Sequence, residues 1–220
     1  MNQKTSIEVA RALLKAGAVK FYPDPKDAIT VKHGIKSPID YNNGEVTKNS
    51  EYYNPILNGF IDVVNNLWDE YDSHADVIIV GVPMGALFWA SCIAHDFGAG
   101  FAFIRKEESE DGMKVKLEKH PRIGKGSKVI IVEDLIVTGS SCLEVVETLR
   151  AAEAEVLGVV AIVSYGCPQA YKNFDAEGVQ FKALTDYSTI VKVGINMKMF
   201  SAEDGAVLEN WHNAPENWGE

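Results

Sequence analysis

Two adjacent carboxylates and a hydroxyl-rich turn follow a single apolar run. Val129 to Val132 are all β-branched and predict a buried strand, and Glu133 and Asp134 come directly after them. Three apolar residues, a hydroxyl-containing turn and a stretch with helical spacing come next: Leu135, Ile136 and Val137, then Thr138, Gly139, Ser140 and Ser141, then Leu143, Val146 and Leu149. Carboxylates accept hydrogen bonds from ribose hydroxyls, and the amides of a helix start bind phosphate. The segment predicts a site for a phosphorylated ribose, against the alternative of an acid pair before an ordinary helix cap.

The elements around this segment are short apolar runs that alternate with helical periodicity. The expected strands are 77–80, 101–104, 129–132, 156–163 and 179–184, and the expected helices are 5–16, 51–71 and 187–198. Such alternation predicts an α/β fold with a parallel sheet covered on both faces. The two acids then stand at the carboxyl edge of the sheet, where ligands bind in folds of this class.

Three regions with different roles are expected along the chain. Residues 1–50 predict a helix and a small hood with weak strands at 28–32 and 38–42, and residues 51–198 predict the α/β core. Inside that core, residues 106–127 are charged and lack apolar periodicity, which favours a mobile loop. Residues 199–220 form an acidic tail that we expect to pack on the body or on a partner.

Composition limits the classes of function. The chain has 220 residues, 46% of them hydrophobic, and a formal net charge of −10, which argues against nucleic-acid and anionic-membrane surfaces. The first 17 residues resemble neither a signal peptide nor a membrane anchor, so we expect a cytoplasmic protein. The cysteines are three in number, far apart and without metal-ligand spacing, which favours reduced thiols.

Residues 5 to 190 resemble the type I phosphoribosyltransferases, and within them the orotate phosphoribosyltransferases. Glu133 to Ser141 is similar to that family's signature for phosphoribosyl pyrophosphate (PRPP). Weaker similarities occur in the expected order: Lys20 on the base side, Lys36-Ser37-Pro38 in the hood, Pro83, Met84 and Gly85 in the pyrophosphate loop, and Arg105-Lys106 as the pyrophosphate pair.

The resemblance implies a fold, a reaction and partners. It implies the type I phosphoribosyltransferase fold with an N-terminal hood, and transfer of 5-phosphoribosyl from PRPP to orotate with Mg²⁺. Glu133 and Asp134 would be catalytic, Leu135 to Ser141 would bind PRPP, and Lys20 with Val137 would meet the base. A homodimer is also implied, in which each mobile loop closes over the neighbouring subunit.

Three departures from the family pattern concern the base and the loop. Ser109 and Asp111 stand where the family has a loop lysine and histidine, and Val137 stands where it has a hydroxyl. Ser164-Tyr165-Gly166 replaces an Asp-Arg pair whose arginine binds the orotate carboxylate, and no arginine follows Arg150. Two alternatives to orotate transfer therefore stay open: transfer to another nucleobase, and a PRPP-binding regulator with weak catalysis.

Overall fold

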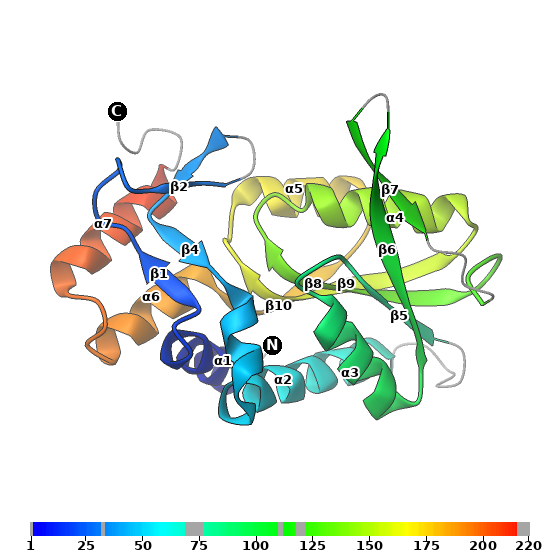
Figure 1. Cartoon of the computed structure of the whole chain (residues 1–220), viewed down its shortest axis with the longest axis horizontal. Helices are drawn as coiled ribbons and strands as arrows, with labels where there is room; N and C mark the ends of the chain where they lie inside the picture. The colour runs from blue at the N-terminus through cyan, green and yellow to red at the C-terminus, as the bar shows by residue number, and fades with distance from the viewer. Residues whose placement is uncertain (1, 32–33, 69–76, 110–111, 118–121, 215–220) are drawn as a thin grey trace.

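The computed structural model describes residues 2–31, 34–68, 77–109, 112–117 and 122–214, without the side chains of 106–109 and 112–117. Its centre is a mixed sheet in the order β10-β9-β8-β5-β6-β7 (Figure 1). The strands are β5 (Val77–Gly81), β6 (Gly100–Ser109), β7 (Gly112–Leu117), β8 (Lys128–Ile136), β9 (Glu155–Ser164) and β10 (Phe181–Asp186). All neighbours pair in parallel except β6 and β7, so the predicted parallel α/β sheet is confirmed.

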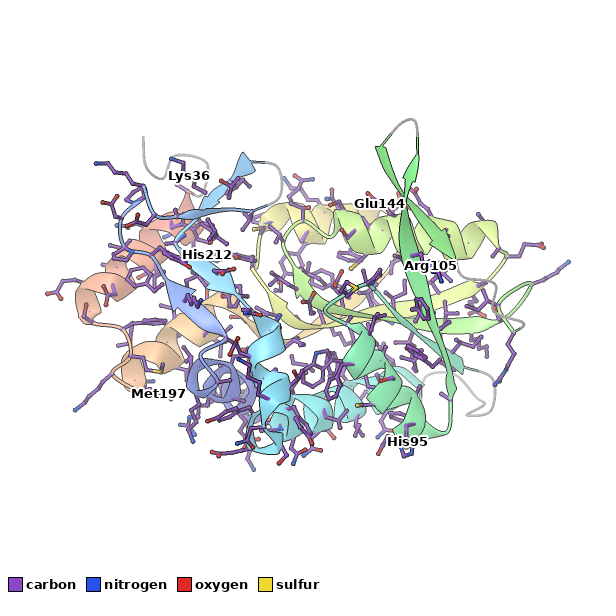
Figure 2. The ribbon with its side chains drawn as sticks, in the orientation of Figure 1. Lys36, His95, Arg105, Glu144, Met197 and His212 are labelled. Carbon is purple, nitrogen blue, oxygen red and sulfur yellow. The ribbon has the colours of Figure 1, made fainter. Side chains whose placement is uncertain are left out.

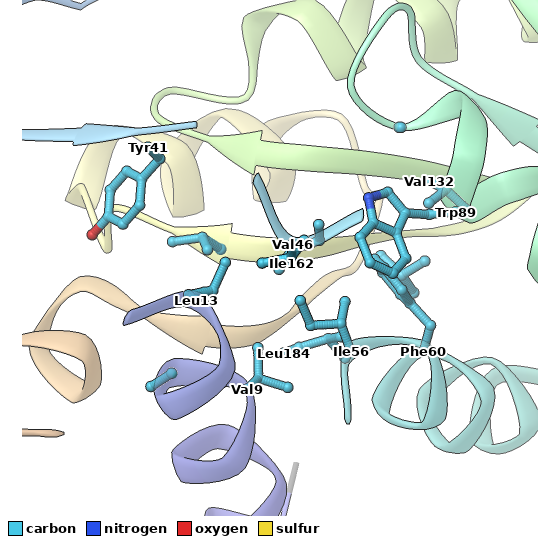
Figure 3. Close-up of a cluster of buried hydrophobic side chains, with 14 of the residues drawn as sticks. Val9, Leu13, Tyr41, Val46, Ile56, Phe60, Trp89, Val132, Ile162 and Leu184 are labelled. Carbon is cyan, nitrogen blue, oxygen red and sulfur yellow. The ribbon is translucent and has the colours of Figure 1, made fainter. Parts of the chain in front are cut away.

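Helices cover both faces of this sheet. On one side lie α1 (Gln3–Lys15), α2 (Ser50–Trp68) and α3 (Leu87–Phe97), and on the other lie α4 (Ser140–Ala151) and α5 (Pro168–Ala176) (Figure 1). The side of α1 to α3 holds the larger apolar cluster, where Leu13, Ile56, Phe60 and Trp89 pack against Ile162 (Figure 3). The spacing of Ile56, Phe60 and the apolar residues after them places one face of α2 against the sheet, as predicted. Within the described residues, no helix has the length and apolar character to cross a membrane.

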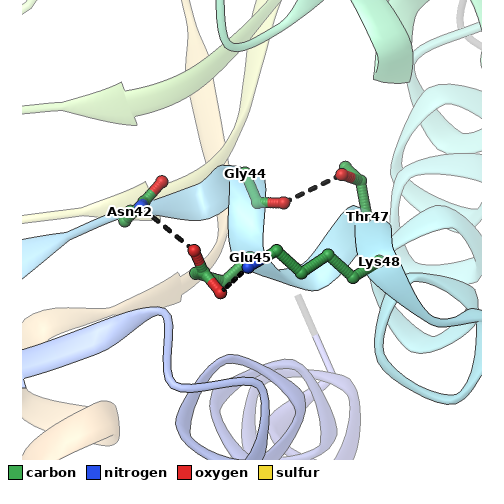
Figure 4. Close-up of polar contacts among 5 residues, drawn as sticks. All are labelled: Asn42, Gly44, Glu45, Thr47 and Lys48. Carbon is green, nitrogen blue, oxygen red and sulfur yellow. Dashed lines mark hydrogen bonds and ion pairs between the residues drawn. The ribbon is translucent and has the colours of Figure 1, made fainter.

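The predicted hood consists of two small antiparallel pairs beside the core. Strand β1 (Val19–Phe21) pairs with β4 (Ile39–Tyr41), and β2 (Ile29–Thr30) pairs with β3 (Lys36–Ser37). A 3-10 helix, η2 (Asn43–Lys48), then leads into α2. Its turn is fixed by local polar contacts: Asn42 donates to Glu45, Lys48 pairs with Glu45, and Thr47 donates to the carbonyl of Gly44 (Figure 4).

The C-terminal part of the described chain packs beside the hood. Helix α6 (Tyr187–Asn196) begins at Asp186, whose carboxylate accepts from the amide of Thr189, and α7 (Ala202–Asn213) begins with a capping box of Ser201 and Asp204. Leu208 and Trp211 of α7 are buried in the main apolar cluster. The expectation that the tail packs on the body is thus confirmed for α7, whereas residues 215–220 lie outside the described chain.

The segment expected to be a loop is partly a ribbon. Strand β6 extends to Ser109 and pairs antiparallel with β7, in the register Ile104 with Leu117 through Ser109 with Gly112. Met113, Val115 and Leu117 alternate with lysines, a period of two that indicates a strand. The prediction of a loop was wrong for 106–109 and 112–117 because that short alternation was overlooked. Asp111, Lys119 and His120 lie outside the described residues.

Candidate active site

The site lies where the order of the sheet reverses. Strand β8 stands between β5 and β9, and the chain runs from β5 through α3 to β6 on one side, but from β8 through α4 to β9 on the other. The two turns therefore diverge from neighbouring carboxyl ends and leave room for a ligand, as is general in open α/β sheets. Residues 82–86 after β5 and residues 133–139 at the end of β8 meet at this point (Figure 1).

Asp134 and Gly85 are in direct contact across these two turns. A Cβ built on Gly85 would lie 2.0 Å from Oδ2 of Asp134, so no larger residue fits beside that carboxylate. In the same turn the peptide bond between Pro83 and Met84 is cis, and the Met84 side chain is 83% exposed. Helix α3 starts here with Ala86 as its N-cap and no side-chain cap, which leaves its first amides for an anion.

Asn43 of η2 fixes the backbone of Asp134. Its Nδ2 donates to the Asp134 carbonyl at 3.1 Å, and the side chain is 4% exposed. The role of Asn43 was not predicted, because nothing in the sequence indicates that η2 lies against the end of β8. The run Asn42-Asn43-Gly44 indicates a turn and nothing more. The hood and the core therefore share a hydrogen bond at the site.

Glu133 is buried between the backbone of Asp134 and Cys142 in the first turn of α4. Its side chain is 6% exposed, with Oε1 accepting from the Asp134 amide and Oε2 accepting from the Cys142 thiol at 3.4 Å. Burial, followed by the side-chain hydrogen bond and the negative charge of Asp134, raises the pKa of Glu133 to about 8. The protonated form of Glu133 is therefore favoured at pH 7, and Asp134 is the more exposed carboxylate of the acid pair.

In the turn before α4, the backbone packs closely against the side chain of Phe174. Gly139 has φ +80°, and a Cβ there would lie 2.5 Å from the Phe174 ring of α5. The carbonyl of Thr138 accepts from Nδ2 of Asn173 at 2.9 Å, so a hydrogen bond from α5 fixes the backbone of the turn. Gly139 is the N-cap of α4 and provides no side-chain cap. The hydroxyl of Thr138 donates to that of Ser140 at 3.3 Å, so polar groups gather at the start of α4, where the first amides have no side-chain cap.

Residues 49–196 match the model of the phosphoribosyl transferase domain, which covers more than half of the chain. The chain belongs to the type I phosphoribosyltransferase family. It is 36% identical over 213 residues to a protein of Streptococcus pneumoniae serotype 19F (strain G54) named orotate phosphoribosyltransferase, covering 97% of both chains. A protein of the same name from Streptococcus mutans serotype c (strain ATCC 700610 / UA159) is 34% identical over 211 residues, 96% of this chain and 97% of the other.

Solved structures of other phosphoribosyltransferases share the fold. The orotate phosphoribosyltransferase of Aeropyrum pernix superposes with a TM-score of 0.70 at 21% identity, covering 88% of this chain and 99% of that chain. The UMP synthase of Leishmania donovani gives a TM-score of 0.76 at 22% identity, over 94% of this chain and 42% of that chain. These likenesses bear out the expected phosphoribosyltransferase fold.

The remaining residues expected at the phosphoribosyltransferase site lie on several elements. Ile136 is 1% exposed and Val137 is 9% exposed, so both side chains pack in the apolar core next to the turn, while Leu135 is half-buried. Lys20 is exposed on β1 opposite Asp40. Arg105 is exposed on β6 (Figure 2), and the side chain of Lys106 lies outside the described residues. Contacts of these residues with PRPP or a base stay predictions.

The turn after β9 differs from the family pattern in a way that the structure explains. Tyr165 is fully buried, and its hydroxyl donates to the carbonyl of Ile39 in the hood at 3.0 Å. Ser164 is 1% exposed, and its Oγ accepts from the amide of Gly166. This turn therefore connects the core to the hood, and its side chains provide no cation for a ligand.

Proposed function

We propose that this phosphoribosyltransferase transfers the 5-phosphoribosyl group from PRPP to orotate, giving orotidine 5′-monophosphate and pyrophosphate. The bond between the anomeric carbon and pyrophosphate breaks, a bond from that carbon to the ring nitrogen of orotate forms with inversion, and the proton of that nitrogen is released to the pyrophosphate or to water. The juxtaposition of Asp134 and Gly85 at the switch point of the sheet carries the proposal of a PRPP site. The near full-length identity to proteins named orotate phosphoribosyltransferase supports orotate as the acceptor.

Asp134 is the acid that we place on the ribose. Its carboxylate accepts from ribose hydroxyls and stabilises the positive charge that develops on the ring as pyrophosphate leaves. Because Glu133 is protonated at pH 7, the acid pair adds a single negative charge beside a substrate that already carries several. A protonated Glu133 also donates a hydrogen bond, so it can orient Asp134 or a ribose oxygen.

The phosphates are assigned to two turns and to the strand β6. The 5′-phosphate fits the turn of Thr138, Gly139, Ser140 and Ser141 at the start of α4, and the pyrophosphate fits the turn of Pro83, Met84 and Gly85. Arg105 and Lys106 on β6 supply positive charge for the pyrophosphate, since guanidinium and ammonium groups both bind phosphate. Lys20 on β1 and Val137 are assigned to the base side.

Mg²⁺ fits the residues of this site through Asp134. Magnesium in phosphate-transferring sites is held by one or two carboxylates together with substrate oxygens, and the described chain contains no group of three acid, histidine or cysteine ligands. Asp134 is the part-exposed carboxylate that would hold the ion. The bound ion would offset the charge of the leaving pyrophosphate.

The β6–β7 ribbon extends beyond the body of the molecule (Figure 1). We propose that it covers the site of a second copy in a homodimer, which would keep water from the developing cation. Sedimentation at assay concentrations tests the dimer: a monomeric, fully active enzyme contradicts it.

A spectrophotometric assay with orotate, PRPP and magnesium tests the reaction. We expect loss of orotate absorbance that depends on PRPP, and little turnover with uracil, adenine or hypoxanthine. If another base is turned over and orotate is not, the acceptor is wrong. If no base is turned over while PRPP raises the melting temperature, the chain is a PRPP-binding protein and the enzymatic proposal fails.

The residue assignment has its own test. The double variant Glu133→Gln with Asp134→Asn keeps the shape of both side chains and removes their ionisable oxygens. Calorimetry is expected to show much weaker binding of PRPP, with no fall in the melting temperature of the free protein. Unchanged affinity for PRPP in this variant would falsify the assignment of the acid pair.

A further inference from the structure

A cavity of about 470 Å³ adjoins the 5′-phosphate turn on the side of the hood. Ile35 of the hood, Thr138 of that turn, Cys167 and Lys172 near α5, and Trp211 and His212 of α7 contribute to its walls. The cavity reaches both Thr138 of the turn assigned to the 5′-phosphate and the hood, so a pyrimidine ring attached to a ribose at Asp134 can extend into it. The cavity therefore has the position and the size for the acceptor base.

His212 lies beside the main chain of Gly166 at the wall of this cavity. A Cβ built on Gly166 would lie 3.3 Å from Cε1 and 3.8 Å from Nε2 of His212, so the imidazole fills the space that a side chain at 166 would take. Gly166 follows β9 and has φ +70°, which a glycine adopts without strain. Gly166 belongs to the segment Ser164-Tyr165-Gly166, which stands where the resembled family has an Asp-Arg pair. In this chain the imidazole of His212, on α7, lies beside that segment.

One ring contact of His212 and two hydrogen bonds of its neighbours fix the orientation of the imidazole. The imidazole stacks on Tyr187 with ring centroids 5.0 Å apart and an interplanar angle of 8°. The Tyr187 hydroxyl donates to the carbonyl of Leu208 at 3.0 Å, which fastens α7 to α6. The indole of Trp211 donates to the carbonyl of Lys36 at 2.6 Å, which fastens α7 to the hood. Figure 2 shows His212 at the end of α7, beside the hood.

Few side chains in the cavity wall could bind an anionic acceptor through positive charge. Among its described lining residues, Lys172 and His212 are the basic ones, and Lys172 is exposed on α5. His212 is half-buried and preoriented, which lowers the entropy lost when it binds a ligand. An N–H of the imidazole donates well to a carboxylate, and more strongly when the ring is charged.

We propose that His212, positioned over Gly166 by α7, recognises the carboxylate of the acceptor base. This role rests on the proposed transfer to orotate, since orotate differs from uracil by one carboxylate. His212 is then a specificity residue: it contacts the acceptor and leaves the PRPP site unchanged. The C-terminal helix replaces, from a different part of the chain, the cation that the turn after β9 lacks.

The affinities for two nucleotides distinguish carboxylate recognition by His212 from a general disruption of the site. Orotidine 5′-monophosphate and UMP differ by the same carboxylate, and calorimetry measures the affinity of both in the absence of turnover. We expect wild type to prefer orotidine 5′-monophosphate and His212→Gln to lose about tenfold of that affinity, the usual effect of one hydrogen bond to a charged group, with UMP affinity unchanged. His212→Lys should recover part of the preference. If His212→Gln keeps the wild-type preference, the proposal is overturned.

Two controls and a second variant complete the experiment. His95→Gln makes the same change at an exposed histidine on α3 and should leave both affinities as in wild type. Loss of the preference in Lys172→Gln, with His212→Gln unaffected, assigns the carboxylate to Lys172 and overturns the proposal. Gly166→Ala presses on the ring without removing it and should also reduce the preference, which covers the case of an unfolded His212→Gln.

Failure of the proposed function gives a different result. A wild-type protein that neither turns over orotate nor prefers orotidine 5′-monophosphate to UMP contradicts both the acceptor and the role of His212. A wild-type protein that does both, together with an unaffected His212→Gln, contradicts the role of His212 alone. Melting temperatures of every variant are measured alongside.

Discussion

The Asp134 carboxylate occupies the space that a side chain at position 85 would need, with Oδ2 only 2.0 Å from an ideal Cβ on Gly85. This contact joins the turns after β5 and β8. The proposed ribose and pyrophosphate sites are therefore parts of one surface, and a change on either turn displaces the other. Predictions about PRPP binding follow from this coupling.

Gly85→Ala is expected to reduce PRPP turnover about a hundredfold, because the methyl group displaces the Asp134 carboxylate and an error of about 1 Å in a reacting group has that effect. The fold should be maintained, since the turn is at the surface. Steady-state kinetics and thermal melting measure the two effects. Gly124→Ala is the matched control, because a Cβ on Gly124 meets no atom within 4 Å. Equal activities of the two variants would refute the coupling.

Glu133 makes the stability of the free protein depend on pH. Its pKa is raised from 4.5 in the unfolded chain to about 8, so its contribution to stability is fully present below pH 4.5 and is lost as the pH rises to about 8. Relative to Glu133→Gln, the free energy of unfolding of wild type should fall by on the order of 1.4 kcal/mol per pH unit within that window. Urea titrations at several pH values measure the difference.

Glu147→Gln, a change at an exposed carboxylate of α4, serves as control and should follow the wild-type curve. Parallel curves for wild type and Glu133→Gln from pH 5 to 8 would mean that Glu133 is charged in the folded protein.

Gly139→Ala tests whether the 5′-phosphate turn depends on the close approach of Phe174. The variant combines the strain of φ +80° with a contact of 2.5 Å, whereas Gly178→Ala has φ +60° and meets nothing within 4 Å. Both should lose about 1 kcal/mol from backbone strain, and Gly139→Ala should lose roughly 1–3 kcal/mol more through overpacking. Only Gly139→Ala should weaken PRPP binding. Similar stabilities in chemical denaturation would show that Phe174 yields freely.

Trp211→Phe should loosen the acceptor cavity without changing the donor site. It removes the hydrogen bond to the Lys36 carbonyl and some buried volume, so we expect a loss of roughly 1–3 kcal/mol in stability. The KM for orotate should rise while the KM for PRPP stays constant. Trp89→Phe, in the core below the sheet, should destabilise the protein and leave the KM for orotate unchanged. A rise in both KM values would place Trp211 in the support of the whole site.

The sequence predicted the strands of the core well and placed most of the proposed donor residues in one segment. Strong local signals exist there: β-branched runs such as Val129 to Val132 predict buried strands, and the acids and hydroxyls of the signature lie within one segment. The contacts of Asn43 with Asp134, of Phe174 with Gly139 and of His212 with Gly166 could not be predicted, because each joins elements that are far apart in the sequence. The protonation of Glu133 depends on burial under α4, which a pattern of residue types does not encode. The many charged residues of this segment also made the alternation of apolar residues and lysines in β7 hard to recognise.

The hydrogen bond between Trp211 and Lys36 closes a loop of 175 residues. Contacts between such distant positions form slowly and only after closer ones have lowered the entropy of the chain. The donor turns, held by neighbouring strands, can thus be in place while α7 is still detached from the hood. Amide hydrogen exchange should then find α7 opening at lower free energy than β5 and β8, in a state that holds a phosphoribosyl group but does not yet distinguish one pyrimidine from another.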